Sequence, residues 1–452
     1  MLLGIALVAP TLGCGGGHPP VAKPTIILIS LNTFRADLLA MKREDGSPET
    51  PSLLHVAREG IWYTDAWAPM PFTLPSHMTM LSGLHPLTHG VVAQDRALAP
   101  EFPTLAEELQ KAGYWTAGVA TTPWLRAHYG FSRGFDTYRA RALVLQFAPR
   151  NIADALAHLH EAPAGKPVFL FVHFYDAHAD SAIDGNRLPY YSPPEYRRDL
   201  HPEPDDLCDA RGRCAVERLS SWTEVQGLAA KIPEPRVDLY FQLYRRGVRY
   251  LDDELGRFFD ELRRSGVWDR ALVVITADHG EEFREHGDFQ HGQVYRELLH
   301  VPLLVKLPDA ERAGEKISNR AELADLAPTL LRRVRAEVPS TMLGRDLLSP
   351  EFPRLRPREL VSMAERPHGL VALRTPQLLV MRPEGKAPAT VFDLARDPTE
   401  HTAAELTPER RAALLQRLRS IVDFLRSRGA AAAAPNPLTA RELEEMKSLG
   451  YL

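Results

Sequence analysis

The sequence predicts an α/β fold in which a central, mostly parallel β-sheet carries helices on both faces. Three apolar runs, residues 25–31, 168–174 and 271–277, have the length and composition of buried strands. Strands that are apolar throughout are typical of parallel sheets covered on both faces. Segments with helical spacing lie between these runs, and such alternation indicates crossover connections. With 452 residues, the chain is long enough for one large domain and a smaller appendage.

The first half of the chain supplies the beginning of this sheet and several of its covering helices. Residues 51–60 suit a short helix, because the segment starts with Pro and ends on Gly. A second helix is expected to follow Pro75. The complete set expected here is strands at 25–31, 114–120 and 168–174, with helices at 51–60, after Pro75, at 103–112 and at 151–160.

The middle of the chain continues the same alternation. Residues 237–264 carry apolar side chains at helical spacing and charged ones on the opposite face, so a long amphipathic helix is expected to lead into the strand at 271–277. Residues 299–305 predict a further strand, in which Pro302 indicates a strand start or a bulge. A helix is expected over 321–334.

The pattern changes after about residue 348. Short apolar segments at 369–373, 377–381 and 390–392 are separated by turn residues, which predicts a small C-terminal antiparallel sheet. An amphipathic helix over 406–428 is expected to pack on it. The predicted organisation is a leader and tether (1–23), a catalytic α/β domain (24–347), a C-terminal subdomain (348–428) and a linker with a tail (429–452).

The N-terminus resembles an export signal. Residues 1–12 are apolar and too short to span a bilayer, and Leu12-Gly13-Cys14 resembles the end of a bacterial lipobox. We therefore expect an exported protein, periplasmic or held at the membrane as a lipoprotein through acylated Cys14. Cys208 and Cys214 then remain either as a short disulfide loop or as unpaired thiols. The net charge of −4 gives no reason to expect a nucleic-acid partner.

The sequence around Asp278-His279-Gly280 indicates a site at the edge of the sheet. It follows the strand at 271–277 directly, and ligands of parallel sheets bind beyond the carboxyl ends of the strands. Further acidic and His residues follow, up to His291. The alternative is a turn in which Asp278 caps a helix. The density of Asp, Glu and His residues favours a metal site.

Two more segments belong to the same edge. Asn32 follows the first strand and offers a side-chain oxygen to a metal. Thr73 comes two residues before Pro75, which we expect to be the first helical residue. The free N–H groups and dipole of a helix N-terminus favour an anion, so a hydroxyl held there beside a metal could attack a phosphoryl or sulfuryl centre. The alternative for Thr73 is an ordinary capping residue.

Taken together, these motifs resemble the sulfatase family of the alkaline phosphatase superfamily. Thr73-Leu74-Pro75-Ser76-His77 is similar to its nucleophile motif, Cys or Ser-x-Pro-Ser-Arg. Tyr175-Asp176-Ala177-His178 is similar to its strand-end segment closing on a His. The resemblance covers nearly the whole chain from residue 25, and its remaining motifs lie at 29–37, 81–86, 248–282, 392–398 and 447–452.

The resemblance implies one divalent cation held by Asn32, Asp278 and His279. In the family this cation is usually Ca²⁺, whereas a coordinating His is also compatible with Mn²⁺ or Zn²⁺. The family's Cys or Ser is converted to formylglycine, a route closed to Thr73. A Thr nucleophile is instead similar to that of the phosphoethanolamine and lipoteichoic-acid transferases of the superfamily, which pass through phospho-Thr and use Zn²⁺ or Mn²⁺.

The resemblance also implies roles for His residues and marks where this chain departs from the family. His77 replaces the Arg of the nucleophile motif, and His291 replaces a late Lys but can still donate a hydrogen bond. His178 stands where the family has a leaving-group acid or a sulfate contact. Thr121 and Pro123 stand near the positions of a family Lys and His. The expected catalytic residues are therefore Thr73, His77, His178 and His291.

Three functions follow as expectations from these residues. The first is a metal-dependent hydrolase of sulfate or phosphate esters, acting on a sulfated or phosphorylated glycan, lipid or small-molecule ester. The second is a phospho-group transferase with a phospho-Thr73 intermediate at a membrane surface. The third is a catalytically impaired member that binds an anion, because Asn32 is neutral and Thr73 and His77 replace the usual residues. The first is the one we expect.

Overall fold

The structure is a computed structural model, and it describes residues 23–141, 147–179, 190, 192–200, 234–364, 369–385, 387–429 and 439. The leader with Cys14, the pair Cys208 and Cys214, and the end of the tail lie outside the described residues. In the parts of the chain that are described, no helix has both the length and the apolar character needed to cross a membrane.

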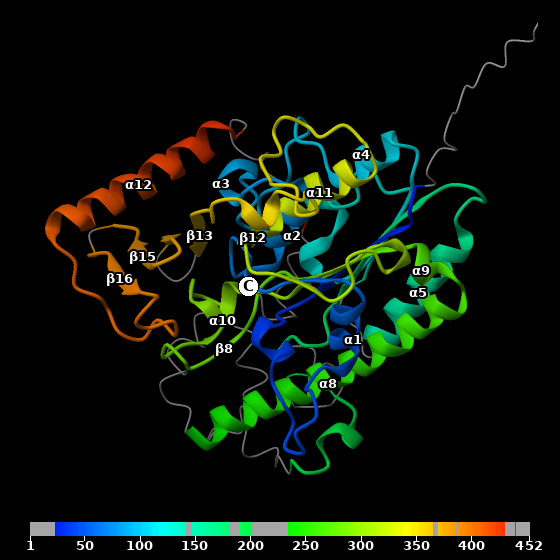
Figure 1. The fold of residues 1–452 in the computed structure, drawn as a ribbon, viewed down its shortest axis with the longest axis horizontal. Helices are drawn as coiled ribbons and strands as arrows, with labels where there is room; N and C mark the ends of the chain where they lie inside the picture. Colours follow the sequence, from blue (N-terminus) through cyan, green and yellow to red (C-terminus); the bar gives the residue numbers. More distant parts are fainter. Residues whose placement is uncertain are drawn as a thin grey trace, which may run out of the picture.

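A central sheet of eight strands organises the molecule (Figure 1). Its spatial order is β11-β2-β10-β7-β1-β6-β4-β5. Neighbouring strands are parallel except where β10 pairs with β7 and β2, so the expected mostly parallel sheet is confirmed. The strands are β1 (Ile26–Leu31), β2 (Ile61–Tyr63), β4 (Trp115–Thr121), β5 (Thr137–Arg141), β6 (Val168–Phe174), β7 (Leu272–Ala277), β10 (Leu303–Lys306) and β11 (Glu315–Ile317).

The three middle strands end at the same level. Leu31, the last residue of β1, lies opposite Phe174 of β6 and Ala277 of β7. Every residue of these strands is buried, as the apolar runs predicted. The residues that follow them therefore meet at one edge of the sheet.

Helices cover the sheet in two groups (Figure 1). One group lies with the long helix α8 and the other with α2. The first group is α1 (Pro51–Glu59), α5 (Phe147–Glu161), α8 (Glu234–Arg264) and α9 (Val267–Arg270). The second is α2 (Thr73–Ser82), α3 (Pro86–His89), α4 (Leu105–Lys111) and α11 (Leu326–Arg333).

The structure corrects two predicted elements. The helix predicted over 321–334 begins only at Leu326, since residues 321–322 form strand β12 (Ala321–Glu322), which pairs with β3 (Ala66–Trp67). A hydrogen-bonded turn between Glu322 and Asp325 separates that strand from the helix. The strand predicted over 299–305 begins at Leu303, because the short helix α10 (Arg296–Leu299) and Pro302 precede it.

The C-terminal part has the predicted antiparallel sheet with a helix. Its four strands are β13 (Leu360–Ala364), β14 (Leu370–Arg374), β15 (Leu378–Pro383) and β16 (Thr390–Asp393), paired in chain order. Helix α12 (Pro408–Ser427) buries Leu418 and Val422 in an apolar cluster with residues of this sheet. The first strand, β13, was not predicted. We propose that residues 348–428 form a subdomain, which this separate cluster supports.

Candidate functional site

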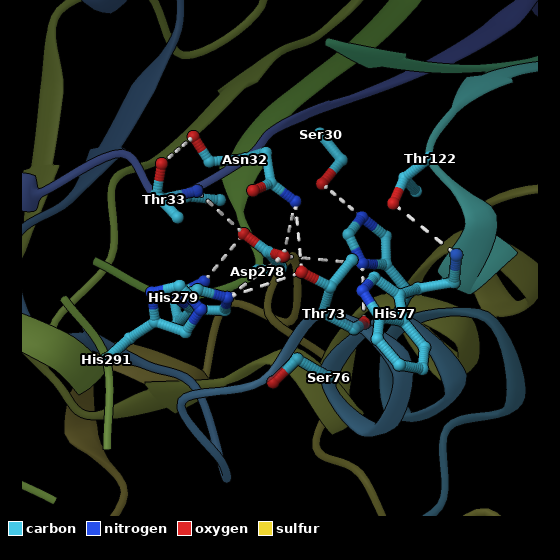
Figure 2. Close-up of polar contacts among 12 residues, drawn as sticks. Ser30, Asn32, Thr33, Thr73, Ser76, His77, Thr122, Asp278, His279 and His291 are labelled. Atoms are coloured by element: carbon cyan, nitrogen blue, oxygen red, sulfur yellow. Dashed lines mark hydrogen bonds and ion pairs between the residues drawn. The ribbon is translucent and has the colours of Figure 1, made fainter. Parts of the chain in front are cut away.

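The edge of the sheet beyond β1, β6 and β7 gathers a fully buried polar cluster (Figure 2). Asn32 directly follows β1, and its Nδ2 donates a hydrogen bond of 2.9 Å to Oδ2 of Asp278, which follows β7. The other carboxylate oxygen, Oδ1, accepts from the backbone N–H groups of Thr33 at 3.1 Å and His279 at 2.9 Å. The predicted convergence of Asn32, Asp278 and His279 is thus present in the structure.

Asp278 carries a buried negative charge that its neighbours stabilise. Burial alone would raise the pKa of Asp278, but His279, His77 and His173, together with the Thr33 N–H, outweigh it and hold the pKa below its ordinary value. No Lys or Arg of the described residues forms an ion pair with this carboxylate. The charge is therefore balanced by hydrogen-bond donors alone, which leaves it suited to a cation.

Thr73 is the first residue of helix α2, whereas the sequence placed it before the helix and made Pro75 the first helical residue. The N-cap is Phe72, and the cap has no side-chain hydrogen bond, so the alternative role of Thr73 as a capping residue does not apply. Its Oγ1 instead lies 3.2 Å from Nδ2 of Asn32 and 3.5 Å from Nε2 of His279. The hydroxyl therefore faces the cluster, at the positive end of a helix (Figure 2).

His279 directs a lone pair at this hydroxyl. Its Nδ1 lies 2.9 Å from the carbonyl oxygen of Gly280 and so carries the ring proton, which leaves Nε2 as an acceptor. Burial lowers the pKa of His279 to about 4, against the opposing effect of Asp278, so the ring is neutral at pH 7. Nε2 lies 3.4 Å from Oδ2 of Asp278. Nε2 of His279 and Oδ2 of Asp278 are both acceptors, and a proton or a cation between them would stabilise this close contact.

His77 lies behind Thr73 and is completely buried. Its Nδ1 lies 2.8 Å from the backbone oxygen of Thr73, so it donates there, and its Nε2 accepts from Oγ of Ser30 at 2.8 Å. Burial lowers the pKa of His77, which favours this neutral form. Both ring nitrogens of His77 thus have hydrogen-bond partners, and His77 connects the first residue of α2 to strand β1.

His178 and His291 lie on the outer side of the cluster. They are 7% and 6% exposed, whereas Asn32, Asp278 and His279 are fully buried. Nδ1 of His291 lies 3.0 Å from Oε1 of Glu281, and its ring centroid is 4.5 Å from that of His279. The His178 ring stacks on Tyr175 and lies 5.4 Å from the His291 ring. All the predicted site residues therefore belong to one cluster.

The side-chain donors of this cluster fit a divalent cation, although they are not arranged as a complete coordination site. Within the described ranges, no group of three or more His, Cys, Asp or Glu side chains is arranged to hold an ion. The available donors are mixed: Oδ2 of Asp278, Nε2 of His279, Oγ1 of Thr73 and the amide oxygen of Asn32. That oxygen, Oδ1, is buried and has no hydrogen-bond partner. Such oxygen and imidazole donors suit a transition metal better than Ca²⁺.

Sequence reasoning assigned no role to two members of the cluster, Ser30 and His173, whereas Glu281 belongs to the acidic and His residues that it noted after Asp278. Ser30 and His173 are neighbours in register on β1 and β6, and the rings of His173 and His77 are 4.9 Å apart. A polar residue inside an otherwise apolar strand was the available signal for both. Thr121, which stands near the position of a family Lys, donates from its hydroxyl to Oδ1 of Asn151, and its backbone N–H lies 3.5 Å from Nδ1 of His173.

Comparison with known proteins gives a consistent result. Residues 24–335 match the sequence model of the family described as Sulfatase. Arylsulfatase K of Xenopus laevis is 24% identical, and the match covers 90% of this chain and 84% of that protein. A solved structure described as in complex with its substrate D-glucosamine-2-N,6-O-disulfate superposes with a TM-score of 0.68 at 20% identity, covering 90% of this chain and 98% of that one. A phosphonate monoester hydrolase from Silicibacter pomeroyi superposes with a TM-score of 0.66 at 18% identity, covering 92% and 98%.

Proposed function

This chain belongs to the sulfatase family, and we propose that it hydrolyses sulfate or phosphate esters with the hydroxyl of Thr73 as its nucleophile. One observation carries the proposal. Oγ1 of Thr73 lies at the N-terminus of α2 and 3.5 Å from the unprotonated Nε2 of His279. An acceptor of this kind withdraws the hydroxyl proton, and the helix dipole stabilises the negative charge that develops.

The nucleophile would act directly, since Thr cannot become the aldehyde that a Cys or Ser yields in the family. Oγ1 forms a bond to the sulfur or phosphorus atom, and the bond from that atom to the leaving oxygen breaks. The leaving oxygen takes a proton from a side chain, and water later cleaves the Thr ester. His178 and His291 are the candidates for the proton donor, because they are the least deeply buried of the predicted His residues of the cluster.

A divalent cation is supported by the metal dependence of this family. Asn32, Thr73, Asp278 and His279 are the residues that would hold it, and it would supply a positive charge to the alkoxide and to the ester oxygens. We propose Mn²⁺ or Zn²⁺ ahead of the Ca²⁺ usual in the family, because His279 offers an imidazole nitrogen. The buried carboxylate of Asp278, which forms no ion pair with a Lys or Arg of the described residues, is the observation that supports a cation here.

His77 supports the nucleophile without touching the substrate. It is fully buried, and it connects the backbone of Thr73 to Ser30. We propose that it fixes the direction of the Thr73 hydroxyl, in the place of the Arg that the family usually has. This assignment refines the expectation that His77 is itself catalytic.

An anionic sugar is the substrate class we propose, since a solved relative was captured with a glucosamine disulfate. A phosphonate monoester hydrolase is also among the structurally similar proteins, so phosphorus esters are included among the proposed substrates. We propose that the protein is exported and that acylated Cys14 attaches it to a membrane. Comparing lipid labelling of the full chain with that of Cys14→Ser tests this attachment, and equal labelling of both would contradict it.

A phospho-group transferase is the second candidate, and Thr73 itself favours it. A Thr nucleophile forms a stable phosphoester, which an acceptor alcohol rather than water could cleave. Mass spectrometry of acid-quenched protein, with and without an added alcohol, separates the two functions. A phospho-Thr73 peptide that disappears only when the alcohol is present would support the transferase.

Turnover by matched variants tests the proposal. The full chain is assayed on an aryl sulfate, a phosphate monoester and a phosphodiester, each with Ca²⁺, Mn²⁺ or Zn²⁺. Thr73→Val removes the hydroxyl at nearly constant shape, and Thr79→Val on the same helix is the control. We expect Thr73→Val to lose roughly 10⁴-fold in kcat, while Thr79→Val keeps most of it. Equal activity in the wild type and Thr73→Val would exclude this nucleophile, whereas no turnover by the wild type on any of these esters would favour the anion-binding alternative.

A further inference from the structure

The amide nitrogen of Asn32 has more close polar neighbours than it has protons. Its nitrogen lies 2.9 Å from Oδ2 of Asp278, 3.2 Å from Oγ1 of Thr73 and 3.2 Å from Nε2 of His173. An amide has two N–H groups, so one of these three contacts goes without a proton. The amide oxygen, in contrast, is buried without any partner. The hydrogen bonds of this side chain are therefore unevenly satisfied.

The neighbour His173 adds a second conflict. The backbone N–H of Thr121 points at Nδ1 of His173 at 3.5 Å, which makes Nδ1 the acceptor and places the proton of the neutral ring on Nε2. The Nε2–H group then faces the N–H groups of Asn32, and two donors oppose each other. Exchanging the ends of the amide, by half a turn about its Cβ–Cγ bond, would remove this conflict.

The exchanged orientation satisfies different neighbours. Oδ1 would accept from Nε2–H of His173, but it would also face the carboxylate oxygen of Asp278. Two oxygens at that separation repel each other unless a positive charge lies beside them. Each orientation of the amide thus suits one state of the site. Without a cation, the amide nitrogen faces Asp278. With a cation bound, the amide oxygen faces Asp278 and the cation.

We infer that Asn32 is a reversible amide switch that sets the affinity of the site for a divalent cation. This inference rests on the proposed function only in placing the cation among Asn32, Thr73, Asp278 and His279. In the cation-free protein, the amide protons take the place of the positive charge and hold Asp278 and Thr73 together. Cation binding requires the Asn32 amide to reverse. The free energy of this reversal lowers the affinity of the site for the cation.

A carboxylate at position 32 would behave in the opposite way. It offers only oxygens, so no turn is needed and a second negative charge attracts the cation. Without a cation, however, two buried carboxylates would lie within 3 Å or so of each other, an arrangement that destabilises the fold or forces a proton between them. Asn32→Asp should therefore bind a cation more tightly and be less stable without one.

Cation binding and thermal unfolding of the full chain test the switch without substrate. Chelator-treated wild type and Asn32→Asp are titrated with Mn²⁺ by calorimetry, and Tm is measured with and without Mn²⁺. Asn151→Asp is the control, because Asn151 is also buried and contacts Thr121 and His173 without touching Asp278. We expect at least tenfold tighter binding for Asn32→Asp, with a lower Tm in chelator and a larger rise on Mn²⁺ addition. Asn151→Asp should show no gain in affinity.

Affinity of Asn32→Asp equal to or weaker than the wild type would overturn the inference, as would an unchanged Tm in chelator. If Asn32→Asp does not fold, wild-type protein labelled with ¹⁵N-Asn decides the question. The side-chain amide signals of Asn32, identified by their loss in Asn32→Ser, should shift when Zn²⁺ binds, and unchanged signals during binding would refute the switch. These measurements use no turnover, so a failed switch leaves the proposed function intact, and an inactive Thr73 does not affect the switch.

Discussion

Oγ1 of Thr73 lies 3.5 Å from Nε2 of His279, although 206 residues separate the two in the chain. The contact exists because strand β7 ends level with β1 and because α2 begins at Thr73 itself. A neutral imidazole acceptor, a hydroxyl and a helix N-terminus thus meet at one point. This combination supports our proposal that Thr73 supplies the nucleophilic oxygen in a chain without the family's usual nucleophile.

Ser30 donates a hydrogen bond to His77, which contacts the backbone of Thr73, so under the proposed function Ser30→Ala should lower kcat. The change leaves Nε2 of His77 buried without a donor, which costs about 1–3 kcal/mol. We expect roughly tenfold lower kcat with KM little changed, because the reoriented Thr73 affects the reaction more than binding. Steady-state kinetics and Tm check this, and Ser30→Thr should restore activity.

The matched control for Ser30 is Ser82→Ala. Ser82 is also fully buried, but its Oγ donates to the carbonyl of Met78 within helix α2, away from the cluster. A loss of kcat in Ser82→Ala equal to that in Ser30→Ala would assign the effect to general loosening of the helix. A lower Tm without a change in kcat for Ser30→Ala would contradict the positioning role of His77.

The sequence predicted the middle of the sheet better than its edges. Strands β1, β6 and β7 are buried on both faces, so they appear as apolar runs. Strand β5 is half-buried and has the polar sequence Thr137–Arg141, and β2 has only three residues. Neither carries an apolar pattern of sufficient length, and their pairing depends on neighbours that are distant in the chain.

The expected helix start and the family resemblance predicted Thr73, His77 and His291, whereas the strand pattern predicted only site residues that follow a strand end. Asn32 and Asp278 do so, and their meeting follows from the common end of parallel strands. Ser30 and His173 lie inside strands, and they become neighbours only because β1 pairs with β6. Strand order is not encoded in local sequence, so their roles required the structure. The orientation of the Asn32 amide depends on hydrogen bonds from three other elements and was equally inaccessible.

Glu282→Gln should stabilise the protein at alkaline pH and have no effect in acid. Burial raises the pKa of Glu282 to about 7, whereas an exposed Glu has a pKa of 4.5. Since the folded state binds the proton more tightly, the wild type bears an unfavourable buried charge above pH 7, and this penalty disappears as the pH falls toward 4.5. Gln resembles the protonated form, so we expect a gain of roughly 1–3 kcal/mol at pH 8.

Urea unfolding at pH 8 and pH 5 measures this difference for Glu282→Gln. The stability of the variant and of the wild type should converge at the lower pH. Glu311→Gln is the control, because Glu311 is half exposed in its pair with Arg333 and should show little pH-dependent difference. A stabilisation of Glu282→Gln that is the same at both pH values would show that the charge of Glu282 is not its cause.

Glu400→Gln should weaken the connection between the C-terminal sheet and strand β3. Glu400 pairs with Arg374 at 2.6 Å, both side chains are almost fully buried, and the Arg374 guanidinium lies 4.1 Å from the Trp67 ring centroid. Removing one partner leaves a buried charge, which costs about 3–5 kcal/mol. The exposed pair of Arg417 and Glu359 provides the comparison, and Glu359→Gln should cost less than about 1 kcal/mol. Chemical denaturation that gives equal losses for both variants would reject the structural role of Glu400.

His291→Gln should slow the hydrolysis of esters with poor leaving groups more than that of esters with good leaving groups. The carboxylate of Glu281 lies 3.0 Å from Nδ1 of His291, and His291 is among the few cluster residues with any exposure. A proton donor matters little when the leaving group is an acidic nitrophenol, and matters much when it is a sugar alcohol. We expect a loss of roughly 10²–10⁴-fold in kcat for an alkyl ester and a far smaller loss for the nitrophenyl ester. Parallel kinetics of both esters with His291→Gln and His178→Gln would identify which His donates the proton. Equal losses on both esters would assign His291 to binding the anion instead.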